Sequence, residues 1–142
     1  MSSVTTAGTE PEHTLLIVDD EPNVVNALRR LLRRDDYRVL TAASADQAME
    51  LLALHDVQVV LADQRMPQVS GTELLARVKE MYPDTVRIVL SGYTDLQTVT
   101  DSINQGAIFK FLTKPWDDDL LREHIREAFL YYDARLNKSA GG

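Results

Sequence analysis

The sequence predicts an α/β domain, a doubly wound sheet of five parallel strands in the order 2-1-3-4-5 with helices on both faces. Five short β-type runs alternate with five helical patterns along the 142 residues. Residues 15–18, 59–62 and 86–90 are almost entirely apolar, which is typical of parallel strands covered on both faces. The alternation requires right-handed crossovers, and this strand order is one of the two common solutions.

The remaining elements follow from mixed strands and from helix punctuation. Residues 37–42 and 107–113 are less apolar, so we expect them at the two edges of the sheet. Pro22 predicts the first turn of the first helix, and Gly106 predicts the end of the fourth. Residues 117–119, all Asp, predict the start of the fifth helix. Three pairs have the spacing of a capping box: Ser44 with Gln47, Ser70 with Glu73, and Thr94 with Gln97.

Composition limits the classes of partner and compartment. The net charge of -7 makes nucleic acid a poor direct partner, and the absence of cysteine excludes disulfides and thiolate metal sites. We expect residues 1–13 to be a disordered lead-in, residues 14–133 to form one domain, and residues 134–142 to be a linker or tail. No apolar run approaches the roughly 20 residues of a membrane span, so we expect a cytoplasmic protein without a membrane partner.

Acidic residues gather where two neighbouring strands are expected to end. Asp19 and Asp20 follow the first strand, and Asp63 follows the third. In the predicted order these strands are adjacent, and their carboxyl ends border the ligand crevice. Three carboxylates that close repel one another, whereas a bound cation would offset the repulsion. Mg²⁺ fits best, because it takes one or two carboxylates and several waters, and no histidine lies nearby to suggest zinc.

A hydroxyl and an amine are expected at the same edge. Ser91 ends the fourth strand, and Lys114 follows the fifth. A carboxylate nucleophile, a metal ion and donors for phosphoryl oxygens are the groups that phosphoryl transfer requires. The sequence therefore indicates a site that handles a phosphoryl group.

These motifs together resemble the response-regulator receiver domain of bacterial two-component signalling, a flavodoxin-like fold. The resemblance covers residues 14–132 and rests on Asp19-Asp20, "LADQRMP" with Asp63, Ser91-Gly92, and "FLTKP" at residues 111–115. It implies that Asp63 accepts a phosphoryl group from a histidine kinase or a histidine phosphotransfer protein. It also implies that Mg²⁺ binds Asp20, Asp63 and the carbonyl of Arg65 directly and Asp19 through water, while Ser91 and Lys114 hold the phosphoryl oxygens.

The resemblance also implies a conformational switch. Ser91 moves inward toward the phosphoryl group, and Phe111 on the fifth strand turns inward to fill the space. It implies a cis Lys114–Pro115 peptide. Side chains at Arg65 and Tyr93 tune access of hydrolytic water in this family, and since both are large we expect slow self-dephosphorylation. Gln64 replaces a commonly apolar residue, and it should point to the opposite face from Asp63.

The output and the competing functions remain hypotheses. Residues 82–95 and 109–129 resemble receivers fused to cyclic-dinucleotide phosphodiesterases or other output domains, so we expect an output domain beyond this chain. The sequence also allows a homodimer that forms on phosphorylation. We expect a self-phosphorylating signalling switch rather than an enzyme. Two alternatives are a phosphatase of the haloacid dehalogenase type, which lacks its second acid because Arg65 stands there, and a pseudo-receiver that binds partners without phosphorylation.

Overall fold

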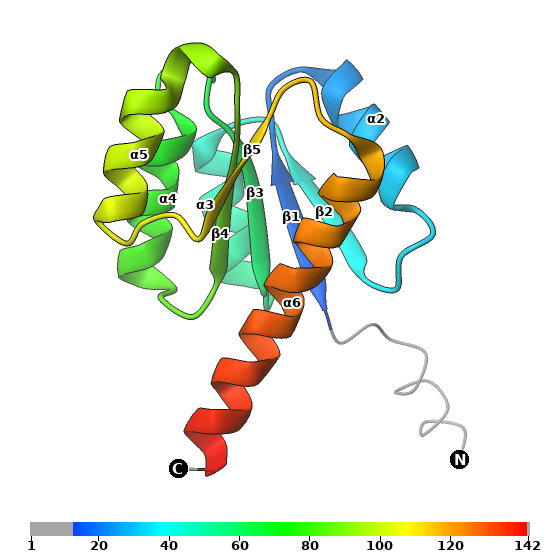
Figure 1. The fold of residues 1–142 in the computed structure, drawn as a ribbon, viewed down its shortest axis with the longest axis vertical. Coiled ribbons are helices and arrows are strands. Elements are labelled where there is room, and N and C mark those ends of the chain that lie inside the picture. Colours follow the sequence, from blue (N-terminus) through cyan, green and yellow to red (C-terminus); the bar gives the residue numbers. More distant parts are fainter. Residues whose placement is uncertain (1–12, 142) are drawn as a thin grey trace.

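The computed structural model describes residues 13–141, apart from the side chains of Tyr93 and of residues 137–141. Its centre is a sheet of five parallel strands in the order β2-β1-β3-β4-β5, which confirms the predicted topology (Figure 1). The strands are β1 (Thr14–Val18), β2 (Arg38–Ala42), β3 (Val59–Asp63), β4 (Val86–Ser91) and β5 (Lys110–Thr113).

Burial separates the central strands from the edges. Every residue of β1 and β3 is buried, and β4 is buried except for Arg87, whereas β2 and β5 are mostly half-exposed. The mixed strands therefore lie at the edges, as predicted. β5 is shorter than the predicted run, because the amide of Ala107 still bonds the Ser102 carbonyl at 2.9 Å and belongs to the end of the preceding helix.

Helices cover both faces of the sheet (Figure 1). One layer contains α2 (Pro22–Leu32) and α6 (Asp118–Gly141); the other contains α3 (Ala45–Leu54), α4 (Gly71–Met81) and α5 (Leu96–Asn104). Each layer packs its apolar side chains against the sheet in a separate buried cluster. Alternate strand residues point into the two clusters, so the sheet is buried on both faces, as the apolar strands predicted.

Most of the predicted helix ends agree with the structure. Pro22 opens α2, Gly106 follows α5 with a φ of +79°, and Asp117 accepts a hydrogen bond from the Leu120 amide at 3.0 Å. Ser70 and Glu73 form the complete capping box at α4. The Ser44 hydroxyl caps the Gln47 amide at 3.1 Å, but the Gln47 side chain accepts from Ala43 instead of Ser44.

The expected cap at Thr94 is wrong. A short 3-10 turn, η1 (Tyr93–Asp95), follows β4, and α5 begins only at Leu96 with Asp95 in the N-cap position. The hydroxyl of Thr94 instead accepts a hydrogen bond from Arg65, and the Gln97 side chain donates to Asp101. Thr94 therefore serves a contact between loops, which sequence spacing does not reveal.

The last helix extends past the domain boundary that we expected at residues 133 and 134. α6 continues to Gly141 and projects beyond the lower edge of the sheet in Figure 1. The predicted lead-in lies outside the described residues except for His13, which contacts Asp133 on α6 at 3.0 Å. Across residues 13–141, no helix combines the length and the apolar character that crossing a membrane demands.

Candidate functional site

The structure brings the predicted acidic residues together at the carboxyl edge of the sheet. Asp63 is the last residue of β3, and Asp19 directly follows β1, whose Val18 pairs with Ala62 of β3. Asp20 is the next residue along the chain. One carboxylate oxygen from each of Asp19, Asp20 and Asp63 lies within 4.8 Å of the others. The adjacency of the strands, predicted from topology alone, thus produces a compact acidic cluster.

Lys114 supplies a positive charge to this cluster. Its ammonium nitrogen lies 2.5 Å from Asp63 Oδ1 and 3.8 Å from Asp19 Oδ2. The residue follows β5 directly, and the Lys114–Pro115 peptide is cis, as expected. Burial opposes the ammonium charge, but the hydrogen bond and the charge of Asp63 outweigh it and raise the pKa of Lys114. Lys114 therefore remains a cation in the site.

The carboxylates are not fully satisfied by the protein. Asp19 Oδ1 accepts a hydrogen bond from the Glu21 amide at 2.9 Å, and Asp63 Oδ1 faces Lys114. Asp19 Oδ2 and Asp63 Oδ2 are buried and have no hydrogen-bonding partner among the described residues. Unpaired buried oxygens are costly unless another group occupies the space between them.

Burial without full hydrogen bonding changes the pKa values of Asp19 and Asp63. Burial raises the pKa of Asp19 to about 6, although the Glu21 amide opposes the change, and the negative charge of Asp63 adds to it. Burial likewise raises the pKa of Asp63, while Lys114 lowers it. Hard oxygen donors that repel one another and lack partners are the donor set that Mg²⁺ prefers. The residues present therefore fit the predicted metal ion.

Ser91 reaches the same edge but faces its own loop. It is the last residue of β4 and is 2% exposed. Its hydroxyl donates to the Gly92 carbonyl at 3.0 Å. Before this hydroxyl can bind a group on Asp63, it must give up that bond.

The loop after β3 is held in place by contacts that sequence reasoning missed. The Gln64 side chain accepts from the Thr72 amide at 2.9 Å and donates to the Thr72 hydroxyl at 3.2 Å. Gln64 thus points toward α4 and away from Lys114, as its place on the strand predicted. Its buried amide group, through both its oxygen and its nitrogen, joins the end of β3 to the start of α4.

Gly71 explains how closely α4 approaches β3. A Cβ atom built on Gly71 would lie 2.4 Å from the carbonyl oxygen of Asp63. The Gly71 amide also bonds the Gln64 carbonyl at 3.1 Å. Any larger residue would push Asp63 away from its position. The glycine beside the Ser70 cap was a signal in the sequence that we did not interpret.

The Arg65 side chain lies across the neighbouring loop. It bonds the carboxylate of Asp95 and the hydroxyl of Thr94, each at 3.2 Å. The side chain of Tyr93, which we expected to tune water access together with Arg65, lies outside the described residues.

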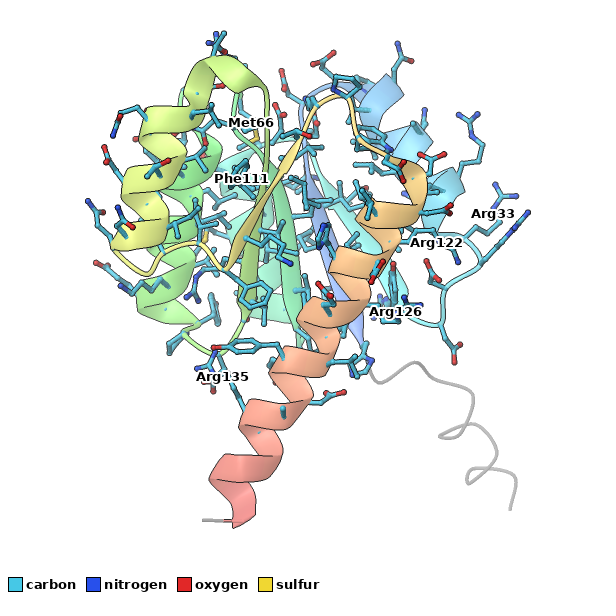
Figure 2. All side chains as sticks on the ribbon, in the orientation of Figure 1. Arg33, Met66, Phe111, Arg122, Arg126 and Arg135 are labelled. Atoms are coloured by element: carbon cyan, nitrogen blue, oxygen red, sulfur yellow. The ribbon has the colours of Figure 1, made fainter. Side chains whose placement is uncertain are left out.

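Phe111 lies on β5 at a distance from the acidic cluster. It is half-buried and packs against the cluster formed by α3, α4 and α5. Figure 2 shows its ring on the side of β5 that faces α4 and α5, below Met66 of the loop after β3. Met66 and Phe111 both pack against this same buried cluster.

Comparison with known proteins agrees with this geometry. Residues 15–126 match the family model of the response regulator receiver domain. A hydrogenase transcriptional regulatory protein, HoxA of Cupriavidus necator, is 44% identical over 119 residues, which are 84% of this chain and 24% of that protein. HoxA of Bradyrhizobium diazoefficiens is 43% identical over 125 residues, which are 88% of this chain and 25% of that protein.

Solved structures give the same result. The signal receiver domain of an HD domain-containing protein from Pseudomonas fluorescens superposes with a TM-score of 0.84 at 36% identity, covering 91% of this chain and 93% of that chain. The chain spans about a quarter of the length of the first curated relatives that it matches. Sheet order, acidic cluster and family model agree. The chain belongs to the response regulator receiver domain family of two-component signalling.

Proposed function

We propose that this domain is a Mg²⁺-dependent phosphoacceptor whose acceptor atom is a carboxylate oxygen of Asp63. The observation that carries the proposal is a pair of buried oxygens, one on Asp19 and one on Asp63, that find no hydrogen-bonding partner in the described part of the chain and lie beside the Lys114 ammonium. A fold without ligands gains nothing from this arrangement, since it costs desolvation and repulsion. A site for a cation and an anionic phosphoryl group accounts for it.

In the proposed reaction, an Asp63 oxygen attacks the phosphorus of a phosphohistidine on a kinase or phosphotransfer protein. A P–O bond forms as the P–N bond breaks, and the imidazole leaves with the electron pair. Lys114 then pairs with the phosphoryl oxygens that develop beside it. Ser91 donates to another oxygen after its hydroxyl leaves the Gly92 carbonyl.

Mg²⁺ would be held by Asp20, Asp63 and the carbonyl of Arg65, with Asp19 acting through a water. When bound, the ion supplies positive charge that screens the phosphoryl oxygens from the carboxylates. This reading makes the domain a self-phosphorylating switch rather than an enzyme that turns over a small substrate. In the switch, Phe111 turns inward when Ser91 moves, and the large residues Arg65 and Tyr93 slow hydrolysis. A phosphoryl half-life of only seconds would contradict that last expectation.

The proposed output is transcriptional control. The HoxA relatives are named as transcriptional regulatory proteins, and they are about four times as long as the region matched here. They do not support the expected cyclic-dinucleotide phosphodiesterase output. We propose that residues 14–133 form the receiver, that residues 134–142 lead toward an output domain, and that the protein acts in the cytoplasm. A phosphorylation-dependent homodimer is compatible with this arrangement.

The test is intact-protein mass spectrometry after incubation with acetyl phosphate, with Mg²⁺ or with a chelator. We expect one phosphoryl adduct that needs Mg²⁺ and disappears in Asp63→Asn. Asp101→Asn is the matched control, since Asp101 is an exposed acid on α5, and it should be labelled like the wild type. No adduct under any condition would favour the pseudo-receiver, and an adduct that survives Asp63→Asn would identify a different acceptor.

A further inference from the structure

Arg65 joins the two loops that flank the phosphoacceptor. It lies two residues after Asp63, and its guanidinium donates to Asp95 Oδ2 and to Thr94 Oγ1, each at 3.2 Å. Thr94 and Asp95 belong to η1, which begins two residues after Ser91. One side chain from the phosphoacceptor loop therefore holds the loop that must move when Ser91 turns toward Asp63.

The ion pair with Arg65 keeps the Asp95 carboxylate from capping the start of α5. It occupies the N-cap position of α5, where an aspartate usually accepts hydrogen bonds from the first helical amides. Here its side chain makes no capping bond, and the carboxylate pairs with Arg65 instead. The Asp95 side chain is only 17% exposed, while that of Arg65 is 72% exposed. If Arg65 leaves, the carboxylate can turn to the helix start, so the loop has an alternative favourable state.

The residue after Ser91 has room to move. A Cβ atom built on Gly92 would meet no atom within 4 Å, so there is open space around the residue after Ser91. The Ser91 hydroxyl is engaged only with the adjacent Gly92 carbonyl. The contacts of Arg65 with Thr94 and Asp95 are therefore polar restraints on this loop, beside a residue that has room to move.

We propose that the contact of Arg65 with Thr94 and Asp95 is a latch that opposes closure of the switch loop and sets the threshold for phosphorylation. This inference rests on the proposed function of Asp63. A phosphoryl group brings roughly 1.5 to 2 negative charges near pH 7, and on Asp63 it would compete with Asp95 for the guanidinium. Opening the latch frees the loop to bring Ser91 inward and frees Asp95 to cap α5. Arg65 and Asp95 are thus positioning residues.

The test measures binding of beryllium fluoride, which mimics an aspartyl phosphate, by calorimetry in saturating Mg²⁺. Asp95→Ala removes the latch and is expected to raise the affinity about two- to five-fold, the range that exposed ion pairs span. In an Arg65→Ala background, the same Asp95→Ala change should have no effect, because no latch remains. Thr94→Val removes one bond only and should raise the affinity less; it also serves if Asp95→Ala fails to fold.

Charge alone makes a different prediction. If net charge alone set the affinity, removing any acid from this anionic chain would help an anion to bind. Asp101→Ala is therefore the matched control, and the latch predicts that it leaves the affinity unchanged. The latch is refuted if Asp101→Ala raises affinity as much as Asp95→Ala, or if the gain persists in the Arg65→Ala background. A fall in affinity in Thr94→Val refutes it as well.

The outcomes also distinguish a failure of the latch from a failure of the proposed phosphoacceptor role of Asp63. If the wild type takes a phosphoryl group from acetyl phosphate and the loop variants bind beryllium fluoride like the wild type, the phosphoacceptor role stands and the latch fails. If the wild type takes neither acetyl phosphate label nor beryllium fluoride, the phosphoacceptor role fails, and the latch fails with it as a control on phosphorylation.

Discussion

Replacing Asp19 with asparagine should stabilise the metal-free protein. The carboxylate is buried, one oxygen has no partner, and its pKa is raised from 3.8 to about 6. At a pH above both values this difference corresponds to about 3 kcal/mol of lost folding free energy, because a tenfold change in an ionisation constant is about 1.4 kcal/mol. The amide in Asp19→Asn can still accept from the Glu21 amide, so we expect most of this penalty, about 2 to 3 kcal/mol, to be recovered.

The destabilisation caused by the Asp19 carboxylate should increase with pH. Because the folded pKa lies above the unfolded one, the native state holds the extra proton between the two values. The penalty is therefore absent below about pH 4, grows as the pH rises through about 6, and is complete near pH 8. The advantage of Asp19→Asn should follow the same course. If Mg²⁺ binds the folded wild type as proposed, it stabilises that state, so the advantage should narrow when the ion is added.

Urea denaturation in a chelator, repeated across this pH range and again with Mg²⁺, measures the difference directly. Asp101→Asn, which removes an exposed acid, should match the wild type at each pH. Equal stability of wild type and Asp19→Asn at high pH would refute the reasoning, since the buried charge would then carry no penalty. An advantage that is constant with pH would attribute the effect to packing rather than ionisation.

Three further perturbations test other parts of the fold and of the site. Gly71→Ala places a Cβ atom 2.4 Å from the Asp63 carbonyl, so we expect a loss of about 1 to 3 kcal/mol in urea denaturation and slower labelling by acetyl phosphate. Arg87→Met removes donors to the carbonyls at residues 83, 85, 106 and 107, and should cost about 1 to 3 kcal/mol in the same assay. Mg²⁺ affinity measured by calorimetry should fall below about pH 6, because a proton on Asp19 then competes with the metal.

The sheet and the acidic cluster could be predicted because few physical choices were open. Short apolar runs such as residues 59–62, alternating with longer helical patterns, favour covered parallel strands, and right-handed crossovers leave a short list of strand orders. Once β1 and β3 are neighbours, Asp19 and Asp63 must meet, since parallel strands end at the same edge. Topology therefore fixed the proximity of residues that are far apart in the sequence.

The contacts within the loops could not be predicted in the same way. Thr94 has the spacing of a helix cap, yet its hydroxyl accepts a hydrogen bond from Arg65, which lies 29 residues away in the sequence. The Ser91 hydroxyl has several acceptors within reach, and the sequence does not say that it chooses the Gly92 carbonyl. Such choices depend on loop conformations of nearly equal energy, which no periodic pattern encodes.

The charges at the site indicate what phosphorylation must overcome. Three carboxylates meet one ammonium, so the fully ionised cluster carries an excess of two negative charges, which a divalent cation matches. A phosphoryl group on Asp63 adds negative charge and demands further donors. Ser91 at the end of β4 and Arg65 in the loop after β3 carry such donors, but each is already bonded, one to the Gly92 carbonyl and one to Asp95. In the proposed switch, the free energy of these two bonds would therefore oppose the movement, and the electrostatic gain at Asp63 would have to exceed it before the loop could move.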